Sequence, residues 1–229
     1  NVHPIRMPED VLATFTTANK TDSVMLSLAS YVPGKSVYFE WNGDGNVTQY
    51  TLESNYKLFR AKSKENAKVR VLVAEADDKL KVFSVSNVKM SQADLSGLKD
   101  TKVIVVAEAG LTNITLPATA PNLTDLNLDG NELSEIDLSH FPKLFSVSLI
   151  GNKIKNFDLS QVKSLNVAYL SSNKMKEIKL DNPNLWNLDL SNNDLESIDL
   201  EKLPALEQLW LNANKLTKVD VSKNSKLAV

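Results

Sequence analysis

Residues 185–200 read LWNLDLSNNDLESIDL, and the same pattern of apolar and polar residues recurs along the second half of the chain. Self-similarity at a fixed period predicts a stack of structural repeats, each contacting only its neighbours. The leucines that open the copies are separated by 21, 21, 20, 21 and 21 residues and stand at Leu123, Leu144, Leu165, Leu185, Leu206 and Leu227. We therefore expect a solenoid over this part of the chain.

The two halves of each copy predict two extended segments. The first half alternates apolar and polar residues, as in Leu188-Asp189-Leu190, which is typical of a strand with one buried face. A unit of this size cannot bury that face alone, so the strands must stack about 4.8 Å apart in one parallel sheet on the concave face. The second half, as in Ile198-Asp199-Leu200, predicts a short extended segment on the convex face.

One asparagine recurs where each copy must turn away from the sheet. An amide can both donate and accept hydrogen bonds, whereas an unpaired buried backbone group costs about 1–3 kcal/mol. We therefore interpret the column as structural, in preference to a polar ligand site. Its members are Asn131, Asn152, Asn173, Asn193 and Asn214.

The repeat L-x-x-L-x-L-x-x-N-x-L resembles that of leucine-rich repeat proteins. Two degenerate copies precede the regular ones, with Val88 and Ala109 in the asparagine position. The expected solenoid therefore covers residues 80–229. It comprises degenerate repeats over 80–122, regular repeats over 123–226 and an incomplete last repeat over 227–229.

Residues 1–79 follow a different pattern, in which short β-rich runs are separated by turn formers, and they predict a small β-sandwich. The stretch from Trp41 to Gly45, W-N-G-D-G, resembles the W-x-G-D-G turn of polycystin-type immunoglobulin-like domains, which would make Trp41 a core aromatic. The expected strands cover residues 11–17, 23–29, 36–41, 47–52, 56–61 and 69–76.

A β-sandwich followed by repeats with D-L-S endings is similar to surface and secreted proteins of Bacteroidetes and, more distantly, to internalins. The resemblance implies an exported bacterial protein, on the cell surface or secreted, that acts through binding. A lipid anchor upstream of residue 1 is compatible with it. The sequence contains no apolar run long enough to span a bilayer, and it has no cysteine for disulfides.

The composition argues against nucleic-acid binding and against catalysis. Lys and Arg total 26 against 28 acidic residues, a net charge of −2 that gives no positive field. The two histidines, His3 and His140, cannot form a histidine-based catalytic centre, and no glycine-rich phosphate loop exists. We therefore expect a protein that is not an enzyme and needs no cofactor.

Two carboxylate patterns could suggest a metal. Four of five copies place an aspartate outward on the convex face, but Lys179 interrupts the column, so we expect Asp side chains that bond local backbone. Residues 42–53 resemble a calcium loop, yet Val47 replaces its required glycine and a hairpin turn is the better interpretation. No metal site is predicted.

The candidate binding residues lie on the concave face, where most outward positions are small or polar. Exposed aromatic side chains are typical interface anchors. We expect either a protein or peptide partner, which we favour, or a glycan whose sugar rings stack on the aromatics. In a third alternative the residues pack on one another or flank the strand and bind nothing. The predicted ligand- or partner-binding residues are Phe145, Tyr169, Trp186, Asp189 and Trp210.

The last repeat opens with Leu227-Ala228-Val229 and stops. A strand with no successor presents unpaired backbone groups. Pairing of two such edges would give a symmetric homodimer, which we keep as an expectation.

Overall fold

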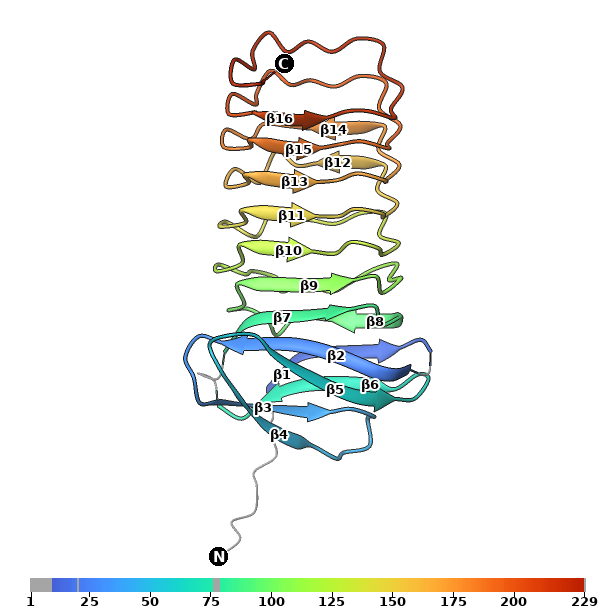
Figure 1. The fold of residues 1–229 in the computed structure, drawn as a ribbon, viewed down its shortest axis with the longest axis vertical. Coiled ribbons are helices and arrows are strands. Elements are labelled where there is room, and N and C mark those ends of the chain that lie inside the picture. The colour runs from blue at the N-terminus through green and yellow to red at the C-terminus, as the bar shows by residue number, and fades with distance from the viewer. Residues whose placement is uncertain (1–9, 20, 76–78, 229) are drawn as a thin grey trace, which may run out of the picture. The chain divides into compact units, whose positions relative to one another are not determined.

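The computed structural model describes residues 10–19, 21–75 and 79–228, so His3 lies outside the described residues. The described chain is mainly β, with sixteen strands and no helix (Figure 1). It divides into two compact units, residues 1–104 with 109–120 and residues 105–108 with 121–229.

Two antiparallel sheets form most of the first unit, as the β-rich runs of the sequence predict (Figure 1). One has the strand order β4-β3-β6-β1-β8, and the other contains β7-β2-β5. The bounds are β1 Asp10–Thr17, β2 Thr21–Ser30, β3 Lys35–Glu40, β4 Thr48–Leu52, β5 Lys57–Ser63, β6 Lys68–Val73, β7 Leu80–Ser86 and β8 Met90–Asp94.

An aromatic cluster packs these two sheets together. The ring centroids of Phe39 on β3 and Phe59 on β5 lie 5.1 Å apart, which joins the sheets through their buried faces. Trp41 stacks on Phe39 at 4.7 Å but is only half-buried, so it lies against the core and is not one of its buried members. The turn after it has Gly43 at φ 67° and Gly45 at φ 81°, a conformation that favours glycine.

The second unit contains the regular repeats of the expected solenoid. Its sheet has the parallel order β10-β11-β13-β15-β16, and each strand pairs in register with the next, so that Leu126, Val147, Ala168, Leu188 and Leu209 form one row. The first four residues of this row are buried, as predicted from the period of two. The bounds are β10 Asp125–Asn127, β11 Ser146–Ser148, β13 Val167–Tyr169, β15 Asn187–Asp189 and β16 Gln208–Trp210, while β9 Val103–Ala107 spans the division between the units.

The back of the solenoid also follows the prediction of short extended segments. Strand β12 Asn156–Asp158 pairs in parallel with β14 Glu177–Lys179, and Phe157 lies opposite Ile178. The arcs between the sheet and the back contain turns and bends only. Each coil therefore needs another source of hydrogen bonds where it leaves the sheet.

The asparagine column supplies those bonds. Nδ2 of Asn173 donates to the carbonyl of Leu170 in its own coil at 3.0 Å and to that of Leu149 in the preceding coil at 2.9 Å. Its Oδ1 accepts from the amide of Ile154 at 3.1 Å, also in the preceding coil. Asn152 and Asn193 repeat all three bonds. The structural interpretation of the column is confirmed.

A second column, of left-handed residues, precedes the asparagines. Its φ angles lie between 54° and 72° at Gly130, Gly151, Ser172, Asn192 and Ala213. At Gly130 a Cβ atom would lie 2.2 Å from the Glu108 carboxyl carbon, so the flexible end of the Glu108 side chain would have to shift.

The degenerate copies share some of these features. Asn87 and Glu108 are left-handed as well, immediately before Val88 and Ala109. Asp94 forms a parallel bridge with Thr115, as expected between stacked coils, although β7 and β8 also pair antiparallel with β2 and β1. The start of the solenoid near residue 80 stays a prediction.

We predict that Asn173→Ala lowers the free energy of unfolding by about 3 kcal/mol, because it leaves two buried carbonyls and one buried amide without their partner. Urea unfolding followed by circular dichroism measures the change. Asn214→Ala is the matched variant in a half-buried position and should cost about 1 kcal/mol. An equal loss in the free energy of unfolding for both variants would show that burial does not determine how much these asparagine hydrogen bonds stabilise the protein.

Candidate functional site

The outward positions of the solenoid sheet form one continuous surface, which we call the sheet face. Four residues per coil belong to it, because they alternate with the buried row on each strand or flank it. The sheet face comprises Thr124, Asp125, Asn127 and Asp129; Phe145, Ser146, Ser148 and Ile150; Asn166, Val167, Tyr169 and Ser171; Trp186, Asn187, Asp189 and Ser191; and Glu207, Gln208, Trp210 and Asn212.

All five predicted binding residues lie on the sheet face, but with different exposure. Phe145 is 47% exposed and Trp210 is 44% exposed, whereas Tyr169, Trp186 and Asp189 are intermediate. Phe145 and Trp186 precede their strands, and the coil of Asn166 lies between them. The aromatic residues are therefore spread over the coils of β11 to β16.

Three of these residues form one row across adjacent strands. Tyr169 on β13 pairs in register with Asp189 on β15, which pairs with Trp210 on β16. Neighbouring strands lie about 4.8 Å apart, so the carboxylate has an aromatic side chain on each side at that spacing. This order was visible in the sequence as two aromatics in the same position of copies on either side of Asp189.

The aromatic rings of the sheet face do not stack on one another in the described part of the chain. Among the described residues, ring contacts join only Phe39, Trp41, Tyr50 and Phe59, all in the first unit. Mutual packing of the concave aromatics, one part of the third alternative from the sequence, thus lacks a ring contact to support it.

Hydrogen bonds of residues on β15 position the row of Tyr169, Asp189 and Trp210. Asp189 Oδ1 accepts from the amide of Ser191 at 3.0 Å and from its hydroxyl at 2.7 Å. Asn187 Nδ2 donates to the Tyr169 hydroxyl at 3.4 Å, while Asn187 Oδ1 is buried without a hydrogen-bond partner. In the sequence Asn187 occupies an outward position of its strand, and no pattern there signals this burial.

The aspartates of the back bond the chain locally, as expected. Asp137 Oδ1 accepts from the Ser139 hydroxyl at 2.6 Å and from its amide at 2.9 Å, and Asp158 bonds Ser160 in the same manner. Asp220 Oδ1 accepts from the Ser222 amide at 2.9 Å. The serine hydroxyl in particular lowers the pKa of all three carboxyls. No group of three potential metal ligands occurs among the described residues.

A second asparagine column on the back was missed from the sequence. Asn182 Nδ2 donates to the carbonyls of Leu159 and Val162, both at 2.9 Å, and Asn224 makes the equivalent bonds to Leu200 and Leu203 at 3.0 Å. The two asparagines occupy one position in alternate copies, where the other copies carry apolar residues. That alternation was the available signal.

Two pockets on the described chain contain several carboxylates, and in each of them lysines lie among the lining residues. One in the first unit, of about 360 Å³, is lined by Asp10, Lys79 and Asp100 among others, but Lys79 Nζ lies 3.7 Å from Asp100 Oδ1. Another on the back, of about 280 Å³, places Asp181 and Asp199 with Lys179 and Lys202. Each carboxylate set is thus accompanied by a cation.

Residues 183–224 match the family model of two-copy leucine-rich repeats. This segment therefore carries leucine-rich repeats, and proteins built of such repeats typically bind partners through extended concave surfaces. The sequence matches no curated protein. Among the residues described, no helix could cross a membrane.

Several solved structures are similar to parts of this chain. A TLR13 complex with ssRNA13 is 25% identical with a TM-score of 0.49, covering 58% of this chain and 22% of that one. InlJ of Listeria monocytogenes is 23% identical with a TM-score of 0.38, covering 73% and 50%. Internalin C2 of the same species is 18% identical with a TM-score of 0.42, covering 64% and 78%. The chain thus spans half or less of the first two proteins.

We predict that Ser139→Ala raises the pKa of Asp137 toward its ordinary value, because the hydroxyl donor is the largest cause of the lowering. A carboxyl whose pKa is lowered by folding stabilises the protein above its unfolded pKa of about 3.9, and this stabilisation is lost as the pH falls through the folded pKa. The substitution should therefore cost stability at neutral pH and almost none below about pH 2.

Carboxyl NMR titration and urea unfolding at the two pH values measure these effects. Ser197→Ala removes another exposed serine and is the control. A pKa of Asp137 that does not move in the Ser139 variant would contradict the assignment.

Proposed function

We propose that this chain is a non-enzymatic protein–protein interaction module that binds a protein or peptide through the sheet face, the concave face of the sequence prediction. The exposed Phe145 and Trp210 carry the proposal. Large aromatic side chains are costly to leave in water and are enriched among the residues that dominate binding energy. The regular sheet fixes the backbone positions of these side chains, so binding costs little additional conformational entropy.

A carbohydrate-binding function is the second candidate. Aromatic rings can stack on sugar faces, and Asp189 and Asn187 beside them could bond hydroxyl groups. We favour a protein partner because the aromatics extend over the coils of β11 to β16, a width suited to a peptide or a protein surface.

We also propose that the protein is exported, on the bacterial cell surface or secreted, and comes from a Bacteroidetes species. The support is the organisation of the sequence, a β-sandwich before repeats with D-L-S endings. We interpret the sandwich as immunoglobulin-like, on the basis of Trp41 and the glycine turn that follows it. A homodimer through the last coil stays a prediction.

We expect Trp210→Ala to weaken partner binding at least about tenfold while lowering the free energy of unfolding by less than about 1 kcal/mol, because this side chain is 44% exposed. Trp186→Ala should also weaken binding, with a larger cost in stability, because Trp186 is half-buried. The partner is first identified by cross-linking in the source cells, then purified and titrated calorimetrically.

Tyr56→Ala is the control, since Tyr56 is 67% exposed and lies in the first unit. Unchanged binding by both tryptophan variants would place the interface elsewhere. A large loss of stability in Trp210→Ala would instead show that this residue belongs to the core.

A further inference from the structure

The charges on the sheet face all have one sign. Its twenty positions include four carboxylates and neither lysine nor arginine, although the chain of 229 residues contains 26 of these cations. At the average frequency, about two of twenty positions would be cationic. The acidic members are Asp125, Asp129, Asp189 and Glu207.

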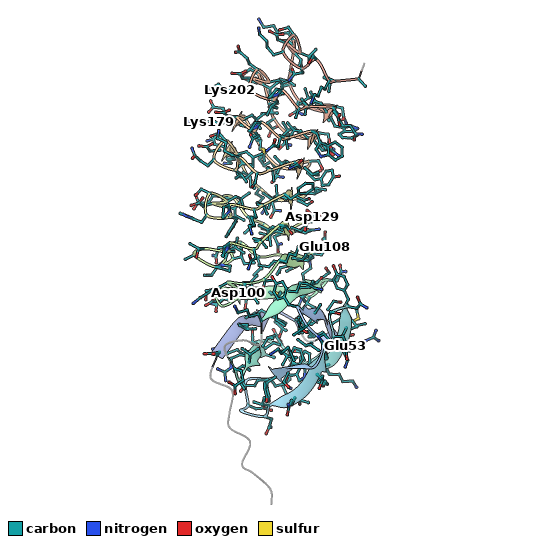
Figure 2. All side chains as sticks on the ribbon, turned by 90° about the vertical axis from the view of Figure 1, so that its left-hand side faces the viewer. Glu53, Asp100, Glu108, Asp129, Lys179 and Lys202 are labelled. Carbon is teal, nitrogen blue, oxygen red and sulfur yellow. The ribbon has the colours of Figure 1, made fainter. Side chains whose placement is uncertain are left out.

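The cations of the solenoid lie elsewhere. Figure 2 shows Lys179 and Lys202 on the opposite side of the solenoid from Glu108 and Asp129. On the back, lysines accompany acids, as where Lys163 Nζ lies 3.0 Å from Asp181 Oδ2. The sheet face therefore presents negative charge without internal compensation, which favours a positively charged partner.

Within the sheet face, the row of Tyr169, Asp189 and Trp210 offers the chemistry that a cation requires. Both hydrogen bonds that Asp189 accepts go to Oδ1, and the described residues donate none to its Oδ2. The aromatic side chains on either side present π-systems whose faces attract cations. A carboxylate oxygen is thus held between two such side chains by strand register.

A second acceptor lies beside this row. Asn187 is 6% exposed, and its Oδ1 has no hydrogen-bond partner, while its Nδ2 reaches the Tyr169 hydroxyl. A buried acceptor without a donor is destabilising, and a ligand that supplies the donor recovers this cost. Asn187 follows Trp186 and lies two residues before Asp189 on the same face of β15, so the two acceptors belong to one stretch of the sheet face.

We propose that Tyr169, Asp189 and Trp210, together with Asn187, bind an arginine side chain of the partner protein. A guanidinium is planar, stacks on aromatic rings and carries five donors in a fixed fork, which can reach two acceptors at once. The lysine ammonium is a compact, strongly hydrated charge and lacks this fork. The inference rests on the proposed function and specifies the chemistry of the ligand at the sheet face.

The test uses the whole chain and the pentapeptide acetyl-Gly-Gly-Arg-Gly-Gly-amide, with lysine and citrulline versions of the same peptide. Citrulline has the shape of arginine without its charge. We expect the arginine peptide to shift the indole N–H signals of Trp186 and Trp210 in a ¹H–¹⁵N spectrum. Trp41, in the first unit, is the internal control and should not shift.

Asp189→Asn should weaken binding of the arginine peptide by at least about tenfold, since a charge-assisted hydrogen bond is lost. The amide keeps an oxygen that can accept the two bonds from Ser191. Asp137→Asn is the matched control, because Asp137 bonds Ser139 in the same manner on the back. Its affinity should equal that of the unmodified chain.

Three results would overturn the inference. Citrulline and arginine peptides could bind equally, Asp189→Asn could leave the affinity unchanged, or a neutral oligosaccharide such as cellohexaose could shift the two indoles where the arginine peptide does not. If the arginine peptide fails while Trp210→Ala still abolishes binding of the purified partner, the arginine site is wrong and the proposed function stands. If Trp210→Ala leaves partner binding intact, the proposed function itself fails.

Discussion

The hydrogen bonds of the asparagine amides are the constraint on which the solenoid depends. At the arc that leaves the sheet, backbone carbonyls and amides have no strand partner, and burial makes them costly to leave unpaired. One side chain such as Asn173 satisfies groups in its own coil and in the preceding one. The bonds that complete a coil therefore also join it to its neighbour, which explains why the repeats form a stack and do not fold singly.

Much of this architecture could be predicted from the sequence because it follows from periodicity. A period of two places Leu188 and Leu190 inside, and the fixed spacing of the leucines places the strands in register. The second amide column, at Asn182 and Asn224, was not predicted because apolar residues fill the same position in the copies between them. A position that tolerates either an amide or an apolar side chain gives no clear pattern in five copies.

The candidate site was predictable in part for the same reason. Alternation predicts which aromatic residues point outward, and strand register predicts that Tyr169 and Trp210 flank Asp189. Burial within an outward row is different, because it depends on the sizes of the surrounding side chains. Asn187 is buried although its position is nominally exposed, and only the packing around β15 shows it.

The parallel register of the sheet has a consequence for how such a surface can change during evolution. Each coil is nearly equivalent to the next and bonds only to its neighbours, so duplication or loss of a whole copy leaves every local contact intact. One added coil between β11 and β13 would move Phe145 away from Trp210 by one strand spacing of about 4.8 Å. The distance between binding residues can thus be altered in fixed steps by genetic duplication, without any redesign of the core.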